Sequence, residues 1–182
     1  MQSCFVDLSI KYDALVERLQ SEGVRLVTKD RVWHQRAIDR LLRIVTFGGQ
    51  SAYLDRYVTT IGRSIYLTPD WDARPLADRY ATLCHEAVHL AQFRRWGLVP
   101  MAIAYVLLPL PFGLAWCRMR IERAAYEETL RVQFHLGGRR SAERMRAHVI
   151  AQFTSASYGW MWPFPRALER WFDDFLDSLE RN

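Results

Sequence analysis

The segment His85-Glu-Ala-Val-His89 combines residue types that can bind a divalent metal and use it. Histidines at positions i and i+4 of a helix lie one above the other on one face, about 6 Å apart at Cβ. Both imidazoles can then reach a single Zn²⁺ at about 2.0–2.1 Å. Glu86 lies beside the metal, where it can take a proton from a zinc-activated water and pass it to a leaving amine. The motif predicts peptide hydrolysis; the alternative is a metal-free pair of hydrogen-bonded histidines.

A catalytic zinc needs a third protein ligand and one open position. A histidine six residues after the motif is absent, because position 95 is arginine. Glu122 is the preferred candidate, since it lies mid-helix with two alanines close behind it that let a second helix approach. Glu127 and Glu128 lie about 140° and 240° round from Glu122 on the same helix, so the three cannot all face one metal.

His85-Glu-Ala-Val-His89 followed by Glu122-Arg-Ala-Ala-Tyr126 resembles the gluzincin branch of the zinc metallopeptidases, in a minimal, minigluzincin-like form. In the related prenyl-protein endopeptidases the second motif reads Glu-x-x-Ala-Asp. The resemblance covers about residues 57–130. It implies a zincin-like fold, a peptide or protein substrate, zinc ligation by His85, His89 and Glu122, and Glu86 as general base. Tyr126 replaces the usual Asp, so it can donate a hydrogen bond to a ligand but brings no charge.

Peptide hydrolysis also needs a donor for the oxyanion that develops on the carbonyl. The candidates are Tyr158, His148 and His135. In enzymes similar to the gluzincins, a tyrosine or histidine from a C-terminal segment has this role. Tyr158 is preferred because it falls in a predicted loop, with a core position beside Trp160 and Trp162 as the alternative.

These residues are distributed over helices, a small sheet and further helices. Helical periodicity, caps and stop signals predict helices over residues 11–22, 29–46, 76–95, 113–136, 141–153 (capped by Ser141) and 165–179. Two β-rich runs, Tyr57–Ile61 and Ser64–Leu67, flank the hairpin signal Gly62-Arg63. Either strand could hold an extended peptide at its edge, or could simply cover the core. The predicted fold class is α+β, mostly helical: one zincin-like domain over residues 1–182 with a small antiparallel sheet.

The composition limits the other classes of function. The chain has 182 residues, half of them hydrophobic, which suits a single domain. Its net charge of +5 comes mainly from arginines with acids interspersed throughout, so nucleic-acid binding is not expected. The three cysteines form no C-x-x-C motif, and the first segment is unlike a secretory signal. Both features predict a cytoplasmic location. The oligomeric state is left open.

Residues 96–117 form an uncharged run of 22 residues, long enough to suggest a transmembrane helix. A single span would place the two histidines and Glu122 on opposite sides of a bilayer, and Pro100, Pro109 and Pro111 interrupt the run. Two interpretations remain: a helical hairpin packed in the core, or an apolar flap that touches substrate or makes weak contact with a membrane. The alternative to an enzyme is a non-catalytic interaction module on the same scaffold.

Overall fold

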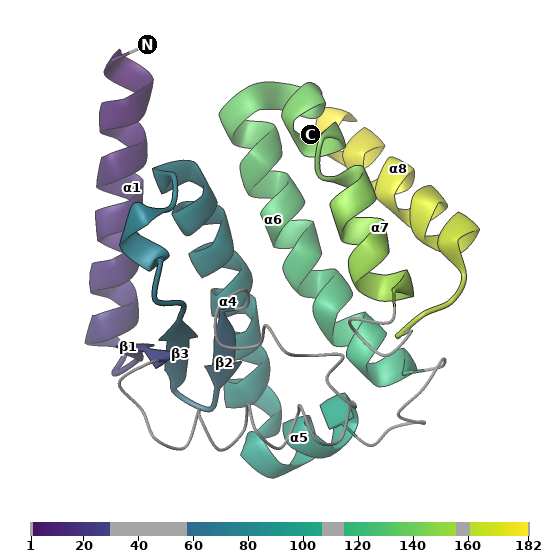
Figure 1. Cartoon of the computed structure of the whole chain (residues 1–182), viewed down its shortest axis with the longest axis horizontal. Helices are drawn as coiled ribbons and strands as arrows, with labels where there is room; N and C mark the ends of the chain where they lie inside the picture. The colour runs from purple at the N-terminus through teal and green to yellow at the C-terminus, as the bar shows by residue number, and fades with distance from the viewer. Residues whose placement is uncertain (1, 30–57, 107–114, 156–160, 182) are drawn as a thin grey trace. The chain divides into compact units, whose positions relative to one another are not determined.

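The computed structural model describes residues 2–29, 58–106, 115–155 and 161–181 (Figure 1). It is an α+β structure, mostly helical, with a small three-stranded mixed sheet. The chain forms two compact units, residues 1–94 and 95–182. The single domain expected from the sequence stays a prediction.

The first unit contains a long helix, the sheet and most of the helix that carries the histidine motif. Its elements are α1 (Gln2–Ser21), β1 (Arg25–Thr28), β2 (Thr59–Ile61), β3 (Ser64–Leu67), the short 3₁₀ helix η2 (Trp71–Ala73) and α4 (Leu76–Trp96). The predicted helix over residues 76–95 is confirmed by α4, and the glycine after it has a φ of 81°, which ends the helix in the left-handed region. The helix predicted over residues 29–46 lies outside the described residues, apart from Lys29.

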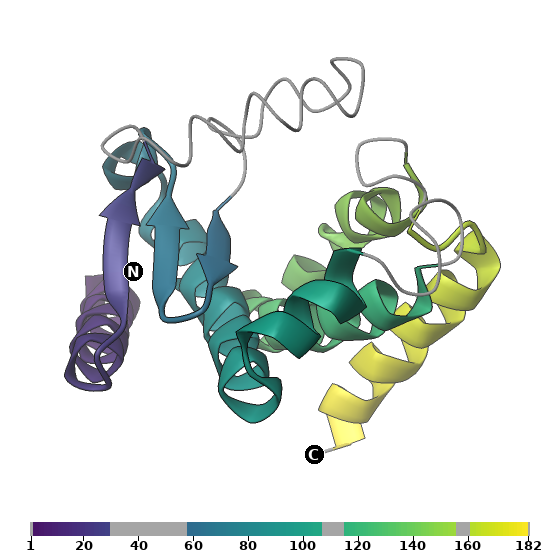
Figure 2. The same cartoon turned by 90° about the horizontal axis from the view of Figure 1, so that it is seen from below.

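The sheet has the order β1-β3-β2, and the strands lie side by side in Figure 2. β2 and β3 pair antiparallel, with Ile61 opposite Ser64, so the two-residue hairpin over Gly62 and Arg63 is confirmed. Gly62 has a φ of 60°, which suits the tight turn. The expected purely antiparallel sheet is wrong, because β1 pairs parallel to β3. A four-residue strand following a helix gives no alternation long enough to be detected in sequence.

All four residues of β3 are buried. The strand lies between its two neighbours, and Ile65 and Leu67 share a core with residues of α1 and α4. The core of the first unit joins α1, β3, η2 and α4 through a set of apolar side chains: Leu15, Leu19, Val24, Ile65, Leu67, Trp71, Leu83 and Leu90. Lys29 is also fully buried, and its Nζ donates a hydrogen bond of 3.1 Å to Thr59 Oγ1. This bond links the residue after β1 to the first residue of β2.

The described residues of the second unit form helices and their connections, and no strand. It contains α5 (Leu98–Val106), α6 (Trp116–Glu143), α7 (Arg146–Thr154) and α8 (Pro165–Arg181), with α6, α7 and α8 packed together. The predicted start of the last helix at Pro165 is confirmed, as proline suits the first turn of a helix. Among the described residues, no helix has the length and apolar character required to cross a membrane.

The predicted stop at Gly137-Gly138 is visible as a kink in α6. Gly137 and Gly138 have non-helical backbone angles, and Gly138 has a φ of 65° and a ψ of −173°. The prediction that Ser141 caps the following helix is wrong. Ser141 lies within the last turn of α6, where its hydroxyl donates to Gln133 Oε1 at 3.0 Å, and α7 begins only at Arg146.

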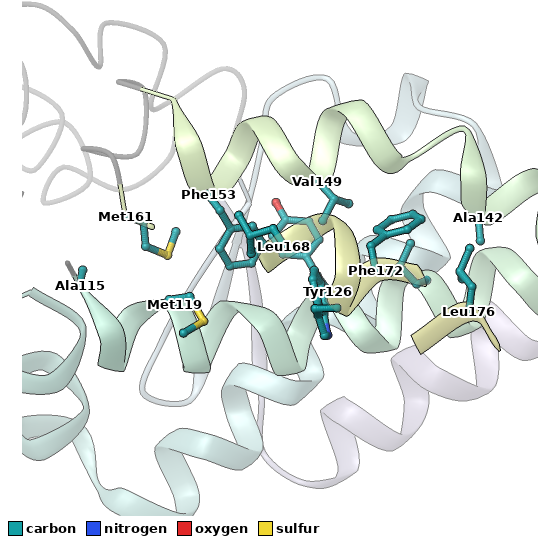
Figure 3. Close-up of a cluster of buried hydrophobic side chains, with 12 residues drawn as sticks. Ala115, Met119, Tyr126, Ala142, Val149, Phe153, Met161, Leu168, Phe172 and Leu176 are labelled. Atoms are coloured by element: carbon teal, nitrogen blue, oxygen red, sulfur yellow. The ribbon is translucent and has the colours of Figure 1, made fainter. Parts of the chain in front are cut away.

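The core of the second unit lies between α6, α7 and α8 (Figure 3). Aromatic rings occupy its centre: Phe153 lies 5.5 Å from Tyr126 and 5.9 Å from Trp171, between ring centroids. Phe172, on α8, is fully buried beside them. The core therefore holds the α6 turn that follows Glu122 in a fixed orientation.

Candidate metal centre

The helix α4 presents His85 and His89 on one face, one turn apart. Their ring centroids are 5.0 Å apart, with the ring planes at 77° to each other. His89 is buried and His85 is half-buried. Two imidazoles at this separation on a rigid helix are arranged as a pair of metal ligands requires, because neither needs a backbone movement to reach a shared ion.

The side chain of Gln92 orients the imidazole of His89. Gln92 Oε1 lies 2.9 Å from His89 Nδ1. An amide oxygen can only accept a hydrogen bond, so Nδ1 is the ring nitrogen that donates in this contact. Nε2 then carries the lone pair, which is the atom a metal would bind. Gln92 was not anticipated, although its position three residues after His89 on the same helix was a usable signal.

Glu86 is buried on α4 and is held by the sheet. Its Oε2 accepts a hydrogen bond of 2.6 Å from the hydroxyl of Thr60, which is also buried. A buried carboxylate is stabilised by such a bond, and the bond restricts the rotation of the carboxyl group. The strand β2 therefore fixes the direction in which the proposed general base points. Nothing in the sequence around Thr60 indicated this contact.

Glu122 is buried on α6 and is held by a residue from α5. Its Oε1 accepts a hydrogen bond of 2.6 Å from the hydroxyl of Tyr105. Tyr105 was not anticipated as a functional residue. Tyr105 is the one residue with a hydroxyl group in the uncharged run of residues 96–117, and a polar group in such an apolar segment was the sequence feature that could have indicated its role.

The ligand atoms of His85, His89 and Glu122 all lie within 4.8 Å of one another, and this group could hold a metal ion. In the part of the chain that the structure describes, no other three histidine, cysteine, aspartate or glutamate side chains form such a group. The three residues are those that the sequence selected as metal ligands.

The two neighbouring acids on α6 have other partners. Glu127 Oε1 accepts a hydrogen bond of 2.8 Å from Trp171 Nε1 and another of 3.2 Å from Arg123 Nε. Glu128 forms an ion pair with Arg131. Both carboxylates are thus engaged on other faces of α6, as the helical geometry predicts.

The structure describes two of the three candidates for the oxyanion donor, His135 and His148. Tyr158 lies outside the described residues. His135 lies on α6, thirteen residues after Glu122, which corresponds to about 20 Å along a helix, and its Nδ1 contacts the carbonyl oxygen of Arg131. His148 is exposed on α7. Neither histidine belongs to the group of metal-ligand candidates.

Tyr126 lies on α6 one turn after Glu122, and its ring belongs to the core of the second unit (Figure 3). A packed ring has few accessible rotamers, so its hydroxyl has a defined position. The expected support of a ligand by Tyr126 stays a prediction.

Of the two strands that could bind an extended peptide, β3 is excluded because it pairs with strands on both sides. β2 pairs with β3 alone among the strands that the structure describes. The same short strand also carries Thr60, the partner of Glu86.

Comparison of the chain with family models, with curated proteins and with solved structures found no match.

Proposed function

We propose that this protein is a zinc-dependent metallopeptidase with a zincin-like fold of the gluzincin type, which hydrolyses peptide bonds in peptide or protein substrates. The observation that carries the proposal is the group formed by His85, His89 and Glu122, with the buried carboxylate of Glu86 adjacent to the first histidine. Two imidazole nitrogens and one carboxylate oxygen form a donor set that catalytic zinc uses, with a fourth position left for water or substrate.

The donor atoms also have suitable spacing. Bonds of about 2.0–2.1 Å in a tetrahedron place ligand atoms about 3.4 Å apart. The ligand atoms of the three side chains lie within 4.8 Å of one another, which is near that spacing. Two of the three ligands have a hydrogen-bond partner that restricts their side-chain orientation: Gln92 contacts His89, and Tyr105 contacts Glu122. Such partners raise the affinity of a site for its metal.

A zinc ion bound there would lower the pKa of a water molecule and polarise the substrate carbonyl. Glu86 accepts the proton of the attacking water and delivers it to the departing amine. Thr60 holds Oε2 of that carboxylate, which leaves Oε1 as the oxygen that exchanges the proton. Because Glu86 follows His85 directly on a helix, its side chain points beside the two histidines and not between them.

The strand β2 is the candidate for substrate binding. An extended peptide could pair with the edge of β2 through main-chain hydrogen bonds, which give affinity without requiring a particular sequence. The hydrogen bond from Thr60 to Glu86 links this strand to the general base. A peptide bound along β2 would therefore lie next to the group that transfers the proton.

Metal content and peptide cleavage, measured on the same preparations, test the proposal. We expect about one zinc per chain in the purified protein and cleavage of members of a peptide library. The Glu86→Gln variant should retain zinc and lose cleavage by about a hundredfold to ten-thousandfold, the usual contribution of a general base. His89→Ala should lose both.

Two outcomes would contradict the proposal in different ways. Failure to bind any divalent metal with micromolar affinity would exclude a zinc enzyme. Zinc binding without cleavage of any peptide, and with no change in cellular phenotype in Glu86→Gln, would instead identify a non-catalytic interaction module.

A further inference from the structure

The helix α5 exposes a continuous apolar face. Leu98, Val99 and Ile103 are 53%, 66% and 42% exposed. With the exposed Ala102 they fall within an arc of about 140° on a 3.6-residue helix. Outside this arc Met101 is 2% exposed, and α5 packs against α6. The exposed arc is thus a second apolar face, in addition to the one that holds the helix in place.

Two exposed tryptophans flank this face in the sequence. Trp96 precedes α5 and is 44% exposed, and Trp116 begins α6 and is 52% exposed. The guanidinium of Arg120 lies 5.7 Å from the centre of the Trp116 ring. Tryptophan is enriched where hydrocarbon meets water, because its ring is apolar and its N–H is polar.

The charged residues that flank this face in the sequence are all arginines. Between Glu86 and Glu122 the sequence contains four arginines and no aspartate or glutamate. One of the four, Arg94, pairs with Glu22. Arg95 and Arg120 are exposed. Arg95 directly precedes Trp96 in the sequence, and Arg120 lies against the ring of Trp116. A surface that is apolar in the middle and positive at its margin complements a negatively charged lipid surface.

We propose that this face, comprising Trp96, Leu98, Val99, Ile103 and Trp116 with Arg95 and Arg120 at its margin, binds the surface of membranes that contain anionic phospholipids. α5 has nine residues and is about 14 Å long, so it would lie in the plane of the interface and not cross it. A protein partner is less well matched, because α5 offers the partner no side-chain hydrogen-bonding group on its exposed face.

Vesicle flotation tests the proposal with the full chain. We expect binding to vesicles of phosphatidylcholine with about a third phosphatidylserine, and weaker binding to phosphatidylcholine alone. The double variant Leu98→Asp/Val99→Asp should lower the partition coefficient at least about tenfold on both vesicles. Arg95→Glu/Arg120→Glu should lower it on the anionic vesicles only. Ile10→Asp, at an exposed position of α1, is the matched control and should bind like the wild type.

The proposal is overturned if the wild-type chain binds neither vesicle, or if Leu98→Asp/Val99→Asp binds as well as the wild type. A shift from dimer to monomer in that variant, seen by light scattering without any vesicle binding, would show that a second copy of the chain covers the face. Brominated lipid should quench the tryptophan fluorescence of the wild type, and the quenching should be weaker in Trp96→Phe/Trp116→Phe. This difference would locate the contact at the two tryptophans. None of these variants alters a candidate metal ligand, so zinc content and vesicle binding are separate measurements.

Discussion

Thr60 on β2 donates a hydrogen bond of 2.6 Å to Glu86 on α4, and both side chains are buried. The bond joins the strand proposed to bind the substrate to the residue proposed to move the proton. A helix alone would allow the carboxyl group of Glu86 to rotate, whereas the threonine selects one orientation. The geometry of the general base thus depends on the sheet as well as on the motif.

Replacing Thr60 by valine should slow peptide cleavage with little change in zinc content. The isosteric change removes the donor, and the Glu86 carboxylate then has a less defined orientation, which we expect to reduce kcat about tenfold or more while KM changes little. Loss of the buried hydrogen bond should also lower the free energy of unfolding by about 1–3 kcal/mol. Steady-state kinetics and urea denaturation measure the two effects.

The Thr60→Ser variant is the control, because serine keeps the hydroxyl and removes only a methyl group. Activity close to that of the wild type is expected. If Thr60→Val lowered stability but left kcat unchanged, Thr60 would have a structural role only.

Glu122 should contribute to zinc binding and its neighbours on α6 should not. We expect Glu122→Ala to weaken zinc binding by about two orders of magnitude or more, since one of three protein ligands is lost. Glu127→Gln and Glu128→Ala should bind zinc like the wild type. Glutamine is chosen at position 127 because its oxygen can still accept the bond from Trp171. Zinc titration against a competing chelator gives the affinities, and a reversed order would assign the third ligand to another residue.

Tyr105→Phe should lower the affinity for zinc without removing a ligand. The substitution deletes the hydroxyl that donates to Glu122 Oε1 and leaves the ring in place. Partners of metal ligands contribute about 10–100-fold to affinity, so a loss of that size is expected. The same competition titration measures it, with circular dichroism as the check on folding. An unchanged affinity would mean that Tyr105 does not orient the carboxylate.

Zinc should raise the melting temperature of the protein and a chelator should reverse the change. Free zinc at a hundred times its Kd stabilises the folded state by about 2.7 kcal/mol. For a chain of this length that corresponds to a shift of about 5–10 °C. Differential scanning calorimetry with and without chelator measures it. In His89→Ala the shift should be absent, and a full shift there would indicate that the metal binds elsewhere.

Gly138→Ala should destabilise the second unit. Gly138 has a φ of 65° and a ψ of −173°, a conformation that is almost confined to glycine. A Cβ there would meet no atom within 4 Å, so the cost is backbone strain, about 1–3 kcal/mol. Thermal or urea unfolding measures the loss. Arg140→Ala, at an exposed position in the same kinked region, should change stability by no more than about 0.5 kcal/mol.

The sequence predicted those elements whose signals are local. The helix that carries His85 and His89 has a long stretch of helix-forming residues and a terminal glycine, and the hairpin has a two-residue turn. Glu122 could be preferred over its neighbours because a helix has a fixed angle per residue. Pro165 at the start of α8 is a similar case, since proline fixes its own φ.

The features that were missed depend on contacts between distant residues. β1 is recognisable only through its parallel pairing with β3, about 40 residues later in the chain. The bonds from Thr60 to Glu86 and from Tyr105 to Glu122 join residues 26 and 17 positions apart. Serine is a residue type that often caps helices, but the helical turn after the kink starts before Ser141. The Ser141 hydroxyl therefore lies inside that turn and donates to Gln133.

The bond between Lys29 and Thr59 connects the end of β1 to the start of β2 at one end of the sheet. Thr28 lies opposite Leu67 in β3, and Thr59 lies opposite Tyr66, so the chain leaves β1 and enters β2 at the same end of the sheet, on the two sides of β3. Strands are spaced about 4.8 Å apart, which separates these two points by about 10 Å. The entropic cost of joining two fixed points in a chain rises only slowly with the number of residues between them. The number of residues between Lys29 and Thr59 can therefore change while the strand register and the Thr60–Glu86 bond are preserved.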